Sequence, residues 1–164
     1  MTMKPTLLFK VPPISAVNAG TAQSANRQDP AVAEMCVPIQ SPSDILEARK
    51  KGRELAGRLG FSPAECTLIT TAISELARNV VPYTRHGEIR LGTASRMGST
   101  GIAITVSDKG PRIRDIHRAM KEGFPTIRDL GLGLPGVKRI MDEFEMISKP
   151  RSGTSISVKK WKPQ

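Results

Sequence analysis

The sequence predicts an α+β fold, a two-layer α/β sandwich in which helices cover one face of a mixed or antiparallel sheet. A short strand precedes two segments with helical spacing, two alternating segments follow, and a further helix precedes a final strand pair. The 164 residues suffice for one domain with its own hydrophobic core and are too few for two ordinary domains. Residues 1–34 show no clear period, so we expect a mobile N-terminal tail followed by one domain over residues 35–164. A helix or strand that docks on a partner is the alternative for this tail.

The first elements of the domain are predicted from local start and stop signals. Residues 34–40 alternate, and Pro38 restricts this strand to the edge of the sheet. Ser41 and Pro42 are typical of a helix start, and Gly60 is typical of a helix end. One face of this helix carries the apolar residues Ile45, Ala48, Leu55 and Leu59.

A second helix is predicted directly after the first. Ser62 and Glu65 form a capping box at its start, and Pro82 stops it after about residue 81. Its buried stripe is predicted to be Ile69, Ile73, Leu76 and Val80. The remaining elements are expected to be strands at 88–93 and 101–107 with a connection at 96–101, a short helix near 115–121, a helix at 134–143, and strands at 144–149 and 154–161.

Composition limits the classes of protein that fit. No stretch approaches the roughly 20 apolar residues that span a membrane, and no signal-peptide pattern is present at the start. Cys36 and Cys66 are too few for a disulfide framework or a zinc site, so we expect two buried or half-buried thiols in a reducing cytoplasm. The net charge of +10 is compatible with nucleic acid, a nucleoside triphosphate or an acidic protein as partner. One Trp and one Tyr offer little surface for stacking on single strands, which counts against nucleic acid.

Glu75 and Asn79 lie four residues apart on the second predicted helix and therefore project from the same side. They flank the apolar stripe, where a carboxylate and a carboxamide are costly unless they face a polar cavity. Their oxygen atoms are the kind of ligand that Mg²⁺ prefers. A solvated helix face is the alternative interpretation of this pair.

Three further features lie at strand ends or in loops. Asp108 ends an apolar strand, where its carboxylate can accept a hydrogen bond from an amine such as that of adenine, and Gly110 permits a tight turn. The glycine-rich segment 131–136 precedes a helix whose start favours phosphate, although it matches neither a P-loop nor a dinucleotide-binding fingerprint. Residues 152–154 place a hydroxyl before the last strand. Each feature alone is also compatible with an ordinary turn or hinge.

The order of these features is more specific than any one of them. Glu-x-x-x-Asn on a helix, Asp-x-Gly after a strand, Gly-x-Gly-Leu before a helix and Gly-Thr before the last strand resemble the motifs of the GHKL ATPases, which have the Bergerat fold. Residues 74–79 (SELARN) and 130–142 (LGLGLPGVKRIMD) are similar to the RsbT-type serine/threonine protein kinases of stressosome signalling. The resemblance covers about residues 37–161 and implies an ATP-dependent protein kinase.

The resemblance also implies a role for each matching residue. Glu75 matches the general base that acts on the attacking hydroxyl, and Asn79 matches the residue that coordinates Mg²⁺ at the phosphates. Asp108 matches the adenine-binding carboxylate, and Arg78 is expected either to face phosphate or to form a surface ion pair. The other residues implied to bind the nucleotide are Gly110, Arg112, Thr126, Gly131, Leu132, Gly133, Leu134, Gly153 and Thr154.

One position departs from the family pattern. Arg112 occupies the last place of a motif that usually reads Asp-x-Gly-x-Gly, so its side chain either reaches a phosphate or crowds the pocket. Residues 111–130 match the mobile lid, which closes on the nucleotide and excludes water. A nucleotide-deficient adaptor of the same fold is therefore an alternative.

The resemblance implies a STAS-domain protein as substrate, either an anti-anti-sigma factor or a stressosome scaffold. A PP2C-type phosphatase is the expected next partner. An RsbW-type anti-sigma factor, which binds a sigma factor directly, is the alternative function within the same fold. We expect neither nucleic acid nor a membrane as a partner, and we expect a cytoplasmic location.

Overall fold

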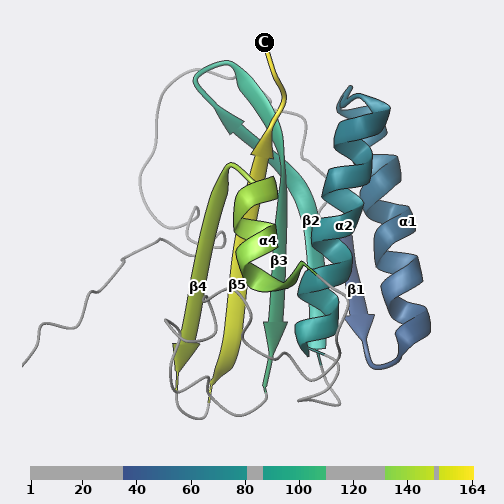
Figure 1. Cartoon of the computed structure of the whole chain (residues 1–164), viewed down its shortest axis with the longest axis vertical. Coiled ribbons are helices and arrows are strands. Elements are labelled where there is room, and N and C mark those ends of the chain that lie inside the picture. The colour runs from purple at the N-terminus through teal and green to yellow at the C-terminus, as the bar shows by residue number, and fades with distance from the viewer. Residues whose placement is uncertain (1–34, 81–86, 110–131, 150–151) are drawn as a thin grey trace, which may run out of the picture. The chain divides into compact units, whose positions relative to one another are not determined.

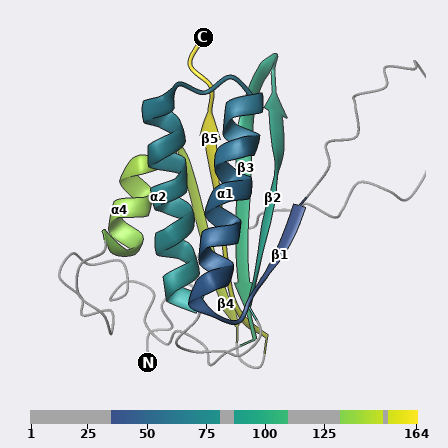
Figure 2. The ribbon, with the colours of Figure 1, turned by 90° about the vertical axis from the view of Figure 1, so that its right-hand side faces the viewer.

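A computed structural model describes residues 35–80, 87–109, 132–149 and 152–164. In this part of the chain, helices α1 (Pro42–Arg58), α2 (Pro63–Val80) and α4 (Gly133–Ile140) lie on one side of a five-stranded sheet (Figure 1, Figure 2). Its strands are β1 (Met35–Ile39), β2 (Gly87–Arg96), β3 (Ser99–Asp108), β4 (Glu143–Lys149) and β5 (Gly153–Trp161). The predicted α+β sandwich is therefore confirmed, whereas the tail at 1–34 and the short helix at 115–121 lie outside the described residues.

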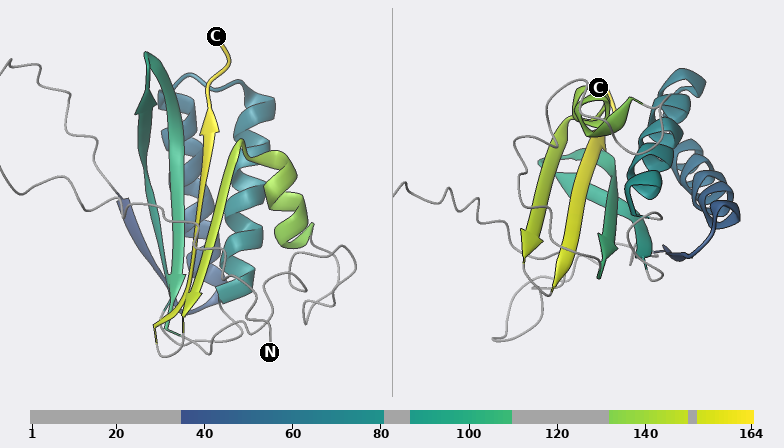
Figure 3. Two further views of the ribbon diagram at one scale, coloured as in Figure 1. Left: turned by 90° about the vertical axis from the view of Figure 1, so that its left-hand side faces the viewer. Right: turned by 60° about the horizontal axis from the view of Figure 1, so that its bottom comes forward.

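The spatial order of the strands is β1-β2-β3-β5-β4. All four pairings between neighbours are antiparallel, so the antiparallel alternative is correct for the described residues. Among the described strands, β1 lies at an edge, as Pro38 predicts, and pairs only with β2. In the right-hand view of Figure 3, α4 lies next to α2 on the β4–β5 side of the sheet.

Both predicted helix starts are capped by carboxylates. Asp44 accepts the backbone N–H groups of Gln40 at 2.9 Å and Ser41 at 2.8 Å, and the first of these bonds is the main reason that the pKa of Asp44 is lowered. At α2, the Ser62 N–H donates to Glu65 Oε2 at 2.8 Å, and the Glu65 N–H donates to Ser62 Oγ at 3.3 Å. These reciprocal bonds satisfy N–H groups that have no partner within the helix.

The core lies between the helices and the sheet. Ile69, Ile73 and Leu76 are fully buried, as their spacing predicts, and they pack against the apolar residues of β2, β3 and β5. On α1 the buried residues also include Gly52 and Ala56, which the apolar pattern does not single out. A Cβ atom at Gly52 would overlap the Ile73 side chain, so the absence of a side chain there allows α1 to approach α2 closely.

The β2–β3 connection is shorter than predicted. The prediction of a connection at 96–101 is wrong, because Arg96 and Ser99 are paired and only Met97 and Gly98 form the turn. Both turn residues have positive φ angles, 48° and 82°, as a two-residue hairpin turn of this kind requires. The polar residues at these strand ends do not alternate in hydrophobicity, which is why the pattern missed them.

The helix predicted at 134–143 differs from α4 at both ends. The structure has it begin one residue earlier and end three residues earlier. α4 begins at Gly133 and ends at Ile140, after which Met141 has extended backbone with φ −94° and ψ 150°. The N–H of Asp142 then donates to the carbonyl oxygen of Lys159 at 2.9 Å. Pairing with β5 therefore takes over from helical hydrogen bonding.

The thiols differ from each other. Cys66 is buried, as predicted, but the prediction that Cys36 is buried or half-buried is wrong, because Cys36 is exposed. Val37 and Ile39 of the same strand are buried, and alternation places Cys36 on the face of the sheet away from the helices.

Trp161 ends β5 and is held by charged neighbours. Its Nε1–H donates to Glu143 Oε1 at 2.9 Å, and the same oxygen accepts a hydrogen bond from Arg96 Nη1 at 2.9 Å. The Arg96 guanidinium lies 4.6 Å from the ring centroid, a cation–π contact. Lys159 Nζ donates to the other oxygen of Glu143 at 2.9 Å, so that β2, β4 and β5 are tied together beside the ring.

Candidate functional site

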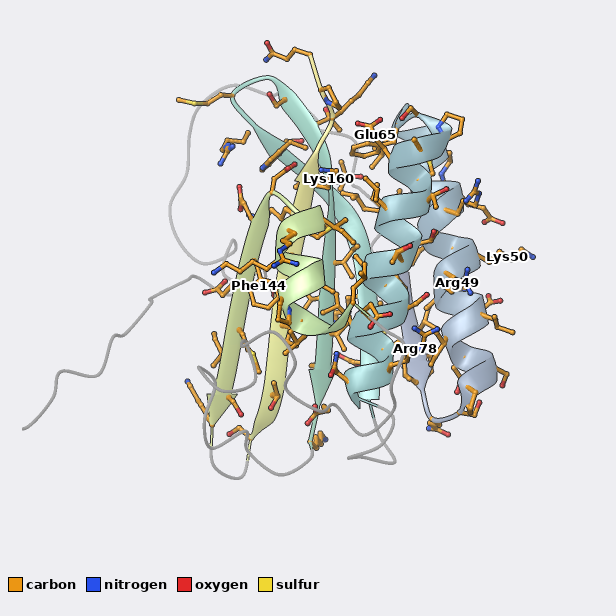
Figure 4. The ribbon with its side chains drawn as sticks, in the orientation of Figure 1. Arg49, Lys50, Glu65, Arg78, Phe144 and Lys160 are labelled. Atoms are coloured by element: carbon orange, nitrogen blue, oxygen red, sulfur yellow. The ribbon has the colours of Figure 1, made fainter. Side chains whose placement is uncertain are left out.

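The sequence-predicted residues gather at one end of the sheet. Figure 1 shows that α2 and β3 run toward the lower end of the sheet, where β5 begins, and that α4 begins beside α2. Glu75 lies near the end of α2, Asp108 is the last residue of β3, Gly133 is the first residue of α4, and Thr154 is near the start of β5. Figure 4 shows Arg78 toward this end of α2, with Glu65 at the opposite end.

Glu75 joins α2 to α4. The residue is only 6% exposed, and its Oε2 accepts the backbone N–H of Gly133 at 3.2 Å. Its Oε1 accepts a hydrogen bond from Arg78 Nη1 at 2.7 Å. A buried carboxylate therefore lies within hydrogen-bond distance of the first N–H of a helix, which is also the kind of position that binds phosphate.

Arg78 pairs with Glu75 in the structure. Its side chain is 57% exposed, whereas that of Glu75 is 8% exposed. Of the two expectations for Arg78, a contact with phosphate or an ion pair, the structure shows the ion pair. The guanidinium has five N–H donors, so pairing with one carboxylate oxygen leaves donors for another ligand.

Asn79 presents a suitable oxygen for a cation. Its Nδ2 donates to the carbonyl oxygen of Glu75 at 2.8 Å. Because the amide is planar and its nitrogen faces the helix backbone, Oδ1 is directed away from that carbonyl. The described residues contain no group of three or more His, Cys, Asp or Glu side chains that could hold a metal ion. Mg²⁺ ions in proteins commonly keep several water ligands and take others from substrate phosphates.

Asp108 and Thr154 face each other across the β3–β5 pair. The Thr154 N–H donates to Asp108 Oδ1 at 3.4 Å, and Thr154 is 6% exposed. The Thr154 hydroxyl makes a 2.9 Å hydrogen bond with the hydroxyl of Ser148 on β4. Sequence reasoning missed Ser148, because only the β4–β5 register places it opposite Thr154.

Two glycines of the site have positive φ. Gly153 has φ +78°, and a Cβ atom there would overlap the Asp108 carbonyl oxygen and lie 2.7 Å from the carbonyl carbon. Gly133 has φ +63° at the start of α4. Glycine at these positions lets β5 approach the end of β3 and lets α4 begin with its N–H toward Glu75.

Comparison with known proteins shows what this arrangement belongs to. The model of the histidine kinase-like ATPase domain matches residues 40–160. The chain is 46% identical over 128 residues to the serine/threonine-protein kinase RsbT of Bacillus subtilis (strain 168), covering 78% of this chain and 96% of that protein. The chain belongs to the histidine kinase-like ATPase family.

Relatives at lower identity are anti-sigma F factors. The chain is 31% identical over 101 residues to that of Oceanobacillus iheyensis, covering 58% of this chain and 69% of the relative. It is 30% identical over 118 residues to that of Thermoanaerobacter sp. (strain X514), covering 70% and 82% respectively. Within the histidine kinase-like ATPases, the chain is thus a member of the RsbT-type serine/threonine protein kinases.

The remaining predicted nucleotide residues of this RsbT-type chain fall into two groups. Leu132 is 56% exposed beside the site, whereas Leu134 is 3% exposed and its side chain packs in the core. Gly110, Arg112, Thr126, Gly131 and the lid at 111–130 lie outside the described residues. Of the helices that the structure describes, none is both long and apolar enough to cross a membrane.

Proposed function

We propose that this RsbT-type chain is a cytoplasmic, ATP- and Mg²⁺-dependent kinase that phosphorylates a serine or threonine of a STAS-domain protein. The observation that carries the proposal is the 3.2 Å hydrogen bond between Glu75 Oε2 and the Gly133 N–H. It brings a buried carboxylate next to a helix start that favours phosphate. A general base beside a phosphate site is what transfer to a hydroxyl requires.

Each described residue has a proposed part. Asp108 would accept a hydrogen bond from the adenine amine, while the Thr154 N–H and the close approach at Gly153 keep the carboxylate in place. The N–H groups that follow Gly133 at the start of α4 would bind phosphate oxygens, while the Gly133 N–H stays on Glu75 Oε2. Asn79 Oδ1 would hold Mg²⁺, and the bound ion would neutralise part of the phosphate charge.

In the proposed step, Glu75 accepts the proton of the substrate hydroxyl as that oxygen attacks the γ-phosphorus. The bond from the γ-phosphorus to the substrate oxygen forms while the bond to the β–γ bridging oxygen breaks. ADP leaves and the substrate carries the phosphoryl group. Positioning and charge stabilisation account for most of the catalysis in reactions of this kind.

The partners are proposed from the relatives. Partner switching between regulatory proteins is supported by the similarity to RsbT and to the anti-sigma F factors. A PP2C-type phosphatase would be the next partner of the released kinase. Direct binding of a sigma factor is the second candidate, and the lower identity to the anti-sigma F factors makes it the weaker one.

The proposal is tested by calorimetry with a slowly hydrolysed ATP analogue, with and without Mg²⁺, and by phosphoryl transfer to STAS-domain proteins. We expect Asn79→Ala to lose the Mg²⁺ dependence and Asp108→Asn to lose affinity. Glu75→Gln should keep binding while transfer falls about 10²- to 10⁴-fold. Glu47→Gln is the matched control, because Glu47 forms a surface pair with Lys51 at 3.3 Å and should change neither quantity. Wild-type protein that binds no nucleotide would refute the kinase proposal and favour the adaptor.

A further inference from the structure

The Glu75 carboxylate has a defined orientation, because each of its oxygens has a different partner. Oε1 accepts a hydrogen bond from Arg78 at 2.7 Å, and Oε2 accepts the N–H of Gly133 at 3.2 Å. The first contact lies within α2 at a spacing of three residues, where side chains share a face. The second contact joins α2 to α4.

The two contacts are geometrically linked. A carboxylate is planar, and rotation about its last side-chain bond exchanges the positions of its two oxygens. Terminal torsions of this kind are broad rather than confined to sharp minima, so the Glu75 backbone alone does not set the carboxylate plane. Once Oε1 is held by Arg78, the direction of Oε2 is determined, and in the structure it is the direction of Gly133.

Asn79 does not provide this restraint. It is also near the end of α2, but its Nδ2 donates to the Glu75 carbonyl oxygen rather than to the carboxylate. Among the contacts that the described residues make, Arg78 is the side chain that holds Oε1. Its bond is short and charge-assisted, whereas the bond to Gly133 is longer.

We propose that Arg78 is a positioning residue for Glu75, which orients the carboxylate toward the first turn of α4 and the hydroxyl that is phosphorylated. This inference rests on the proposed role of Glu75 as general base. The exposed side of the guanidinium stays in water, while its Nη1 holds the plane of the Glu75 carboxylate in one orientation. Arg78 acts through Glu75 and does not need to touch the nucleotide.

The test uses the full chain with Arg78→Met, which removes the charge and the donors, and Arg78→Lys, which keeps the charge with a different geometry. Lys51→Met is the matched control, because it breaks the exposed pair of Lys51 with Glu47 on α1. Three quantities are measured: kcat for phosphoryl transfer, the Kd of the ATP analogue, and the position of the Gly133 amide signal in a ¹H–¹⁵N spectrum.

We expect Arg78→Met to lower kcat about ten- to a hundred-fold, because a small misplacement of a catalytic group has effects of this size. The Kd should stay within about three-fold, well below the ten-fold change that 1.4 kcal/mol of lost binding produces. The Gly133 amide signal should move, and Arg78→Lys should restore part of both kcat and signal position. Lys51→Met should leave all three quantities unchanged.

Two results would overturn the inference. A Kd that rises as much as kcat falls would mean that Arg78 binds phosphate directly. Unchanged kcat and an unchanged Gly133 signal would mean that the contact is an ordinary surface pair. If the wild type transfers no phosphate, the proposed function fails, but the Gly133 signal in Arg78→Met still decides whether Arg78 positions Glu75.

Discussion

Replacing Gly153 by alanine should damage both the stability and the nucleotide site. The residue has φ +78°, which costs a side-chain-bearing residue about 1–2 kcal/mol. The new Cβ would also overlap the Asp108 carbonyl oxygen and lie 2.9 Å from the Lys109 Cα, so the backbone of β3 must shift. Overpacking of this kind adds about 1–3 kcal/mol. We therefore expect the free energy of unfolding to fall by about 2–5 kcal/mol.

Gly98→Ala separates the two contributions. Gly98 has φ +82°, almost the same as Gly153, but a Cβ there meets nothing within 4 Å. This variant should lose only the conformational part, about 1–2 kcal/mol, in urea unfolding. It lies in the β2–β3 turn, far along the sheet from Asp108, and should leave the affinity for the ATP analogue unchanged. The steric reasoning is refuted if Gly153→Ala unfolds at the same urea concentration as Gly98→Ala and binds nucleotide normally.

Three further predictions concern the core and the sheet. Ile73→Ala should lower the free energy of unfolding by about 2–5 kcal/mol in urea titrations, because Ile73 of α2 is fully buried and lies against Gly52 of α1. Ser148→Ala should cost about 1 kcal/mol by the same assay and weaken nucleotide binding slightly, because the buried Thr154 hydroxyl loses its 2.9 Å partner. Glu145→Gln should raise the free energy of unfolding at neutral pH. Burial raises the pKa of Glu145, and the buried Oε1 has no hydrogen-bond partner among the described residues. When folding raises the pKa of a carboxyl group, its ionised form destabilises the protein at pH values above the pKa of the unfolded chain. The stability gained by Glu145→Gln should therefore disappear as the pH falls below that pKa, and a gain that persists in acid would contradict this cause.

Local signals made much of the fold predictable. Ser41 with Asp44, and Ser62 with Glu65, each encode a helix start within four residues, and both starts are confirmed. The apolar spacing of α2 likewise predicted its buried face, because large apolar side chains at helical intervals share one face, and that face packs on the core. Boundaries that depend on partners distant in the sequence were not predictable. α4 ends at Ile140 because the next residues pair with β5, and nothing local requires it.

The site was predictable to the extent that it follows motif order. Glu75 and Asn79 lie in the last two turns of α2, Asp108 ends β3 and Gly133 begins α4, although their roles remain predictions. Sequence reasoning could not give the contact of Glu75 with Gly133, which depends on how α4 packs on α2. The partner of the Thr154 hydroxyl was missed for a similar reason, since a serine on an edge strand carries no signal until the register is known.

The environment of Trp161 has a practical consequence. It is the chain's single tryptophan, and it terminates β5 at the end of that strand away from Thr154. Its ring contacts charged groups of β2, β4 and β5, so its fluorescence should report on the pairing of these strands. Unfolding can then be followed by the emission of this one side chain. A change in emission when nucleotide is added would show that binding near Asp108 alters the far end of β5.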